Sequence, residues 1–128
     1  MDSVNKSSFR FLVVDDSEFA RRNMNKILTS VGGESAGFAV NGREAIEQYL
    51  KLKPDVVFMD ITMPEMEGVE AVQGIIGHDS AAKIVMVSSN GYQEMIKSAL
   101  DSGAKHFLIK PVEPKQVASV VDFVLGEC

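Results

Sequence analysis

Polar residues end four of the short apolar runs of this chain, and their types suit metal binding and phosphoryl transfer. Each of these runs stops at a carboxylate, a hydroxyl or an ammonium group, and the residues concerned are Asp15, Asp16, Asp60, Ser88, Ser89 and Lys110. In an open parallel sheet, ligands bind outside the carboxyl ends of the strands. If the runs are neighbouring parallel strands, side chains from four separate places in the chain meet at one edge.

Three carboxylates at one edge of a sheet would repel one another. Two unit charges ~4 Å apart cost about 4 kcal/mol at an effective dielectric near 20, and one lysine offsets only part of this. Oxygen ligands with residual negative charge and room for water suit Mg²⁺, with Mn²⁺ as a substitute. A carboxylate beside Mg²⁺, an ammonium and a hydroxyl can attack phosphorus, because those groups neutralise the transferring phosphoryl oxygens.

Purely structural explanations exist for the residues of the first and last of these runs. Asp15 and Glu18 have the spacing of a helix capping box. Asp16 or Ser17 could cap the same helix without any metal. Lys110 could be a solvated strand end. Each of these alternatives stays open when its residue is considered alone.

The other two runs also have structural alternatives. Asp60 could end a strand in a turn made by Pro64 and Gly68. Ser88, its neighbouring serine and Asn90 could start a helix. That all four explanations should hold at once on one sheet edge would be a coincidence. We therefore favour a shared chemical site.

The elements that must position these residues alternate between short apolar runs and longer amphipathic stretches. This alternation is typical of strand and helix units repeated around a parallel sheet. Five strands are predicted, at residues 9–14, 34–39, 56–59, 83–87 and 105–109. The third and fourth are nearly all apolar, which predicts central strands covered on both faces.

Five helices are predicted from apolar residues at helical spacing, which we expect to face the core. These residues are Phe19, Met24, Ile27, Leu28 and Val31; Ala45, Ile46, Tyr49 and Leu50; Val69, Val72, Ile75 and Ile76; Met95, Ile96, Ala99 and Leu100; and Val117, Val120, Val121 and Val124. Pro114 is expected in the first turn of the fifth helix. Gly42, Gly91 and Gly103 are expected near helix ends.

Composition narrows the class of protein. The 128 residues are 45% hydrophobic, which is enough for one domain with one core. The net charge is -5 and no basic stripe exists, so we expect no direct nucleic-acid binding. Cys128 is the only cysteine, which excludes a disulfide framework and a cysteine metal site. No apolar stretch approaches the ~20 residues of a membrane span, and residues 1–10 do not read as a signal peptide, so we expect a cytoplasmic protein without membrane insertion.

Four motifs resemble those of the response regulator receiver domain, and specifically its stand-alone chemotaxis type. They are FLVVDDS at 11–17, VFMDITMP at 57–64 with Gly68, VMVS at 85–88 and FLIKP at 107–111. The resemblance implies a flavodoxin-like, doubly wound α/β fold, with a five-stranded parallel sheet ordered 2-1-3-4-5 and five helices in three layers. We expect one receiver domain over residues 9–126, an N-terminal tail over 1–8 and a C-terminal tail over 127–128.

The resemblance also implies roles for the site residues. Asp60 would accept the phosphoryl group. Asp16, Asp60 and the main-chain carbonyl of Thr62 would bind the metal directly, and Asp15 would reach it through water. Lys110 would hold a phosphoryl oxygen, and its peptide bond to the following proline is expected to be cis.

Signalling would follow from a change of surface. Ser88 would move toward the new phosphoryl group, and Phe107 would change rotamer. The implied output face consists of the fourth helix, fifth strand and fifth helix, with Tyr92, Gln93, Lys97, His106, Phe107 and Lys115. The implied partners are a CheA-like histidine kinase as phosphodonor, a target such as the flagellar motor switch, and a phosphatase. We expect a monomer with no attached effector domain, and no enzyme activity beyond self-phosphorylation and autodephosphorylation.

Three other functions share part of this chemistry or this fold. An intermediate receiver of a phosphorelay would use the same chemistry. A haloacid dehalogenase-type phosphohydrolase needs a second Asp two residues after its nucleophile, where this chain has Thr62. A flavin-binding flavodoxin-like module needs a phosphate loop after the first strand, where Asp15 and Asp16 would repel the phosphate.

Overall fold

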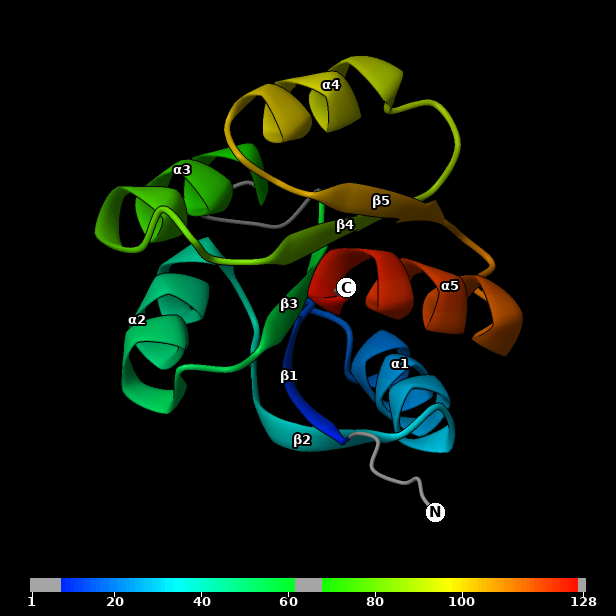
Figure 1. Ribbon diagram of the computed structural model, residues 1–128. Coiled ribbons are helices and arrows are strands. Elements are labelled where there is room, and N and C mark those ends of the chain that lie inside the picture. Colours follow the sequence, from blue (N-terminus) through cyan, green and yellow to red (C-terminus); the bar gives the residue numbers. More distant parts are fainter. Residues whose placement is uncertain (1–7, 62–67, 127–128) are drawn as a thin grey trace.

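Five parallel strands lie between two layers of helices in the computed structural model, which describes residues 8–61 and 68–126 (Figure 1). The strands are β1 (Phe9–Val14), β2 (Gly33–Ala39), β3 (Val56–Asp60), β4 (Ile84–Ser88) and β5 (His106–Ile109), and their order in the sheet is β2-β1-β3-β4-β5. The helices are α1 (Glu18–Ser30), α2 (Gly42–Leu52), α3 (Gly68–His78), α4 (Gln93–Asp101) and α5 (Pro114–Leu125). The predicted fold class and strand order are confirmed.

The middle of the sheet is apolar on both faces. Every residue of β4 is buried, and β3 is buried except for its last residue, Asp60. This is the pattern of strands that are covered by helices on both sides, as predicted from their composition. The edge strand β2 is more exposed, and its register with β1 shifts between Phe11 and Leu12.

Helices α1 and α5 cover one face of the sheet, and α2, α3 and α4 cover the other (Figure 1). Two apolar clusters result. One contains Leu28 and Val117 beneath α1 and α5, and the other contains Tyr49, Val72 and Ile96 beneath the remaining helices. Burial of these faces drives the packing, at roughly 25 cal/mol per Å² of apolar surface.

The helix ends follow local hydrogen-bonding rules. Ser17 caps α1, since its Oγ accepts the N–H of Ala20 at 3.2 Å. Asn41 caps α2 by accepting the N–H of Glu44 at 2.8 Å, while the Glu44 carboxylate accepts a backbone N–H in return. Pro114 stands in the first turn of α5, as predicted.

Two predicted core residues are in fact exposed. Phe19 is 82% exposed and Leu50 is 42% exposed. A helix turns about 100° per residue, so Phe19 lies about 140° around α1 from Met24, which is buried. Leu50 directly follows the buried Tyr49 and is turned away from the core for the same reason.

Candidate metal and phosphoryl site

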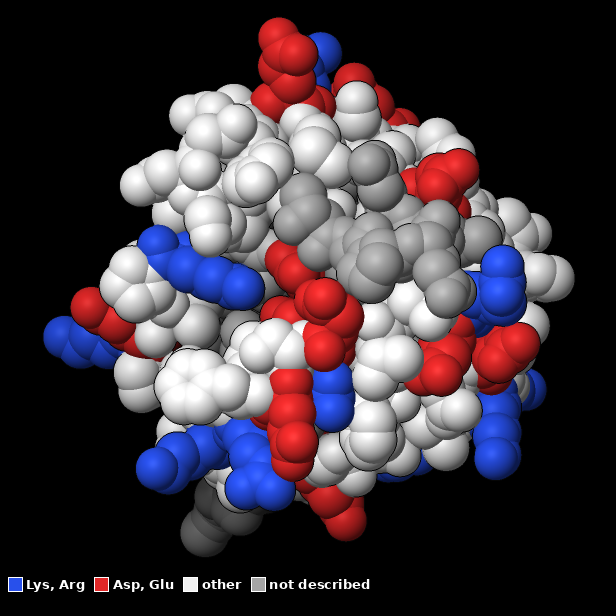
Figure 2. All heavy atoms as spheres, turned by 180° about the vertical axis from the view of Figure 1, so that it is seen from behind, with Lys and Arg blue, Asp and Glu red and all other residues white. Residues whose placement is uncertain are grey.

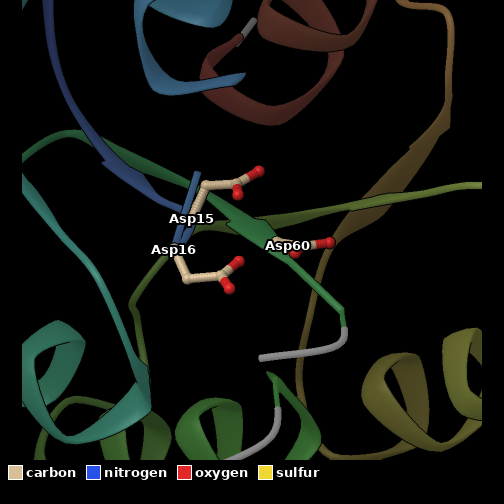
Figure 3. A group of neighbouring side chains, drawn as sticks. All are labelled: Asp15, Asp16 and Asp60. Carbon is tan, nitrogen blue, oxygen red and sulfur yellow. The ribbon is translucent and has the colours of Figure 1, made fainter. Parts of the chain in front are cut away.

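Three carboxylates meet at the carboxyl ends of β1 and β3, as Figure 3 shows. Asp15 and Asp16 directly follow β1, and Asp60 is the last residue of β3. Each of the three offers an oxygen within 4.8 Å of the others. The register explains this, because Val14 pairs with Met59 and the next residues of both strands therefore lie side by side. The predicted convergence of these aspartates is confirmed.

Backbone hydrogen bonds continue past the ends of the neighbouring strands. The N–H of Ile61 donates to the carbonyl of Val87 at 3.0 Å, and the N–H of Lys110 donates to the carbonyl of Ser88 at 2.7 Å. These bonds hold the first loop residues in line with the sheet. Asp60 and Lys110 are thereby supported by rigid backbone.

Asp15 is buried, and both its side chain and its backbone make polar contacts with other residues. Its Oδ1 accepts the N–H of Ser17 at 2.9 Å, and its Oδ2 lies 3.7 Å from Nζ of Lys110. Its own N–H donates to the carbonyl of Ala39 at 3.1 Å. Its carbonyl accepts from Nη1 of Arg21 at 2.9 Å. Both side-chain oxygens of Asp15 are therefore already engaged by groups of the protein.

The remaining carboxylates are more accessible, since Asp16 is exposed and Asp60 is half-buried. A pair of unit charges 4.8 Å apart repels by about 3.5 kcal/mol at an effective dielectric near 20. The single ammonium of Lys110 compensates only part of the charge of three carboxylates. An all-oxygen, net negative group with solvent access fits Mg²⁺. Figure 2 shows acidic atoms gathered near the middle of one face of the molecule.

Gly68 allows α3 to begin against the end of β3. Its N–H donates to the carbonyl of Ile61 at 3.1 Å. A Cβ at this position would lie 2.8 Å from the carbonyl oxygen of Asp60 and 2.9 Å from that of Ile61. The absence of a side chain is therefore required for this approach, which holds the backbone of Asp60 in place.

Ser88 ends β4 and is fully buried, and its Oγ donates to the carbonyl of Ser89 at 2.7 Å. It does not start α4, because that helix begins at Gln93 and has no side-chain cap. The alternative in which these hydroxyls cap a helix is therefore wrong. The Lys110–Pro111 bond is cis, as expected. Thr62, the expected carbonyl ligand, lies outside the described residues, as does Pro64.

A cavity of about 220 Å³ opens beside the carboxylates. Asp15, Asp60 and Lys110 contribute to its polar wall, while Phe19 and Pro111 contribute to its apolar wall. The cavity therefore leaves Asp60 open to solvent next to the Lys110 ammonium group. Phe19 is thus placed at the site and not in the core.

The residues of the expected output face are accessible to solvent. Its residues are exposed or half-buried, and they are Tyr92, Gln93, Lys97, His106, Phe107 and Lys115. Phe107 is 37% exposed, and the His106 ring contacts Phe123 of α5 edge-on, with the centroids 5.3 Å apart. Sequence reasoning missed Phe123, although it is the large apolar residue of α5 that falls outside the stripe of core valines.

Sequence reasoning also missed Arg21. A helical side chain near the N-terminus points back over the first turn, so a basic residue six positions after Asp15 was a usable signal.

Within the described residues, no helix combines the length and the apolar character that crossing a membrane requires.

Comparisons with known proteins agree with this geometry. Residues 11–122 match the family described as the response regulator receiver domain. The chain is 48% identical to the chemotaxis protein CheY of Thermotoga maritima, over 90% of this chain and 96% of that protein. It is 41% identical to CheY of Bacillus subtilis, over 91% and 98% of the two chains. A chain in the crystal structure of the CheX–CheY–BeF3–Mg complex of Borrelia burgdorferi is similar, with a TM-score of 0.87, 35% identity and coverage of 93% and 90%.

Proposed function

Because the chain belongs to the response regulator receiver family and is a chemotaxis response regulator, we propose that Asp60 is the residue that accepts its phosphoryl group. The observation that carries this proposal is the meeting of three carboxylates and one ammonium at the strand ends. Asp60 is the carboxylate that belongs to the central strand β3, and it lines the cavity beside Lys110. We take residues 9–126 as the receiver domain.

Receiver domains use Mg²⁺ at their acidic phosphorylation site, and the acidic cluster of this chain fits that ion. Asp16 and Asp60 would bind it directly, because they are the accessible carboxylates. Asp15 would act through water, because its two oxygens already accept from Ser17 and pair with Lys110. Bound Mg²⁺ would neutralise negative charge on the transferring phosphoryl oxygens. The carbonyl of Thr62 is the further ligand that the family resemblance implies.

Transfer from a phosphohistidine donor is an in-line displacement at phosphorus. A carboxylate oxygen of Asp60 forms the new bond to phosphorus as the donor P–N bond breaks, and the departing imidazole nitrogen takes its proton from water. Lys110 supplies positive charge from within the cavity wall. Its ammonium lies near Asp15 before transfer and can turn to a phosphoryl oxygen afterwards.

The phosphoryl group must then favour one conformation over another. A ligand shifts an equilibrium only through its different interactions with the two states. Ser88 and Lys110 are the groups that we assign to this difference. The Ser88 hydroxyl would exchange its bond to the Ser89 carbonyl for one to the phosphoryl group. Repacking of Phe107, which is only partly exposed, would carry the change to the output face.

Proteins of this kind are signalling proteins and not turnover enzymes. Self-phosphorylation and autodephosphorylation are the activities that we assign to the chain. The phosphohydrolase alternative is not favoured, because similarity to chemotaxis proteins extends over most of the chain. The role of phosphorelay intermediate is not favoured for the same reason.

The partners follow from the family. We assign a histidine kinase of the CheA type as phosphodonor and the flagellar motor switch as target, with the protein acting as a monomer. The Borrelia CheY was crystallised with CheX. A phosphatase that acts on phosphorylated Asp60 is a further partner, which we assign from the family resemblance.

Incubation with acetyl phosphate and Mg²⁺, followed by intact-mass measurement, tests the acceptor. Wild type should gain one phosphoryl group, and Asp60→Asn should gain none because an amide is a poor nucleophile. Asp101→Asn is the matched control, since Asp101 is an exposed carboxylate that pairs with Lys97 on α4. Labelling of Asp60→Asn to the wild-type level would refute the assignment.

A further inference from the structure

Arg21 lies next to the carboxylate cluster but is not part of it, and it bridges two segments of the chain. Its Nη1 donates to the carbonyl of Asp15 at 2.9 Å, and its guanidinium carbon lies 4.6 Å above the ring centroid of Phe38. We propose that Arg21 is a positioning residue for the metal site, which holds the loop between β1 and α1 so that Asp16 faces the ion. This inference rests on the proposed function.

The hydrogen bond acts on the peptide group that joins Asp15 to Asp16. That group is planar, so fixing the direction of its carbonyl also fixes the direction in which the chain enters Asp16. The preceding peptide group is fixed as well, because the N–H of Asp15 donates to the carbonyl of Ala39 at 3.1 Å. Asp16 is exposed and sits in the turn before α1. Its orientation as a ligand therefore depends on this backbone.

The ring of Phe38 stabilises the hydrogen bond between Arg21 and the carbonyl of Asp15. Phe38 is 56% exposed and precedes Ala39 at the end of β2. The long side chain of Arg21, which is half-buried, loses freedom when it makes a single hydrogen bond. Stacking on an aromatic ring offsets that loss and restricts the guanidinium to one plane. Arg21 is thus supported by the same strand end that accepts the N–H of Asp15.

The direction in which Mg²⁺ affinity changes when Arg21 is removed distinguishes a positioning role from a purely electrostatic one. A guanidinium beside a cation site repels the cation, so removal of its charge alone should strengthen Mg²⁺ binding. Removal of an anchor should weaken Mg²⁺ binding, because the ligand then samples other orientations. Arg22 is the matched control. It follows Arg21 in α1, carries the same charge and pairs with Glu18 at 2.9 Å on the exposed side of the helix.

Mg²⁺ titrations of isotope-labelled protein, followed by NMR, provide the test. Arg21→Ala should bind Mg²⁺ about tenfold more weakly than wild type, at the low end of the effects of outer-shell groups on metal affinity. Arg22→Ala should bind as tightly as wild type or slightly more tightly. Arg21→Lys should recover part of the loss, since an ammonium can reach a carbonyl but cannot stack as a planar group.

A second readout needs no metal. In metal-free protein, the Ser17 amide, which donates to the side chain of Asp15, should exchange with deuterium faster in Arg21→Ala than in Arg22→Ala. Phe38→Leu keeps the charge of Arg21 and should weaken Mg²⁺ binding by a smaller factor in the same direction. If Arg21→Ala does not fold, the Mg²⁺ affinity of Phe38→Leu tests whether Arg21 positions the metal site.

Two results would count against different parts of the account. Mg²⁺ affinity in Arg21→Ala equal to or above that of Arg22→Ala overturns the positioning role and leaves the metal site intact. Absence of Mg²⁺ binding by the wild-type protein overturns the metal site itself, and the positioning role with it.

Discussion

Replacement of Gly68 by alanine should destabilise the fold and slow phosphorylation together. The added Cβ would lie 2.8 Å and 2.9 Å from the carbonyl oxygens of Asp60 and Ile61, which are backbone atoms and cannot turn away. Overpacking of this kind costs roughly 1–3 kcal/mol. Helix propensity returns at most about 1 kcal/mol when glycine becomes alanine. With the full return from helix propensity, the expected net loss is up to about 2 kcal/mol of unfolding free energy.

Gly77 provides the matched control within the same helix. A Cβ there would meet nothing within 4 Å. Gly77→Ala should therefore stabilise the protein by up to about 1 kcal/mol, so that the two variants differ by about 2 kcal/mol in urea denaturation. The phosphorylation rate with acetyl phosphate should fall in Gly68→Ala only, because displaced carbonyls move Asp60. Equal stability of the two variants would refute the packing argument, and an unchanged rate in Gly68→Ala would refute the link to Asp60.

Three further predictions concern metal, switching and pH. Asp16→Asn should weaken Mg²⁺ binding in an NMR titration far more than Glu47→Gln, which changes an exposed carboxylate of α2. Equal affinities would remove Asp16 from the ligand set. Ser88→Ala should still accept phosphate but should gain little target affinity; wild-type affinity of the phosphorylated variant, measured with the purified target, would exclude the switch role. Burial, and then the hydrogen bond to Asp79, raises the pKa of the Tyr49 hydroxyl above its ordinary 10.0. The unfolded chain therefore loses this proton at a lower pH than the folded protein does. The unfolding free energy of the wild type should consequently fall above about pH 10. Tyr49→Phe should show less of that fall in urea denaturation at alkaline pH, and an identical fall in both proteins would contradict the sign.

The meeting of Asp15, Asp16 and Asp60 could be predicted because it depends on few facts. Parallel strands end at the same edge, and the polar residues directly follow apolar runs. The order of the strands is different, because hydropathy says which residues form a strand but not which strand lies beside it. That order came from the family resemblance and was then confirmed.

Features that depend on how one element approaches another could not be read from periodicity. The exposure of Phe19 follows from where the buried stripe of α1 begins, which depends on how the helix lies on the sheet. The closeness of Gly68 to the end of β3 reflects the path of α3. The contact of Arg21 with Phe38 joins α1 to an edge strand whose register shifts. Each of these requires three-dimensional placement of the backbone.

The site of phosphorylation is the central claim, and chemical mapping tests it most directly. Borohydride reduces an aspartyl phosphate to homoserine, which marks the acceptor permanently for peptide mass spectrometry. After phosphorylation with acetyl phosphate and Mg²⁺, homoserine should appear at position 60 and should be absent when the phosphodonor is omitted. Homoserine at position 15 or 16, or at none of the three aspartates of the cluster, would contradict the account.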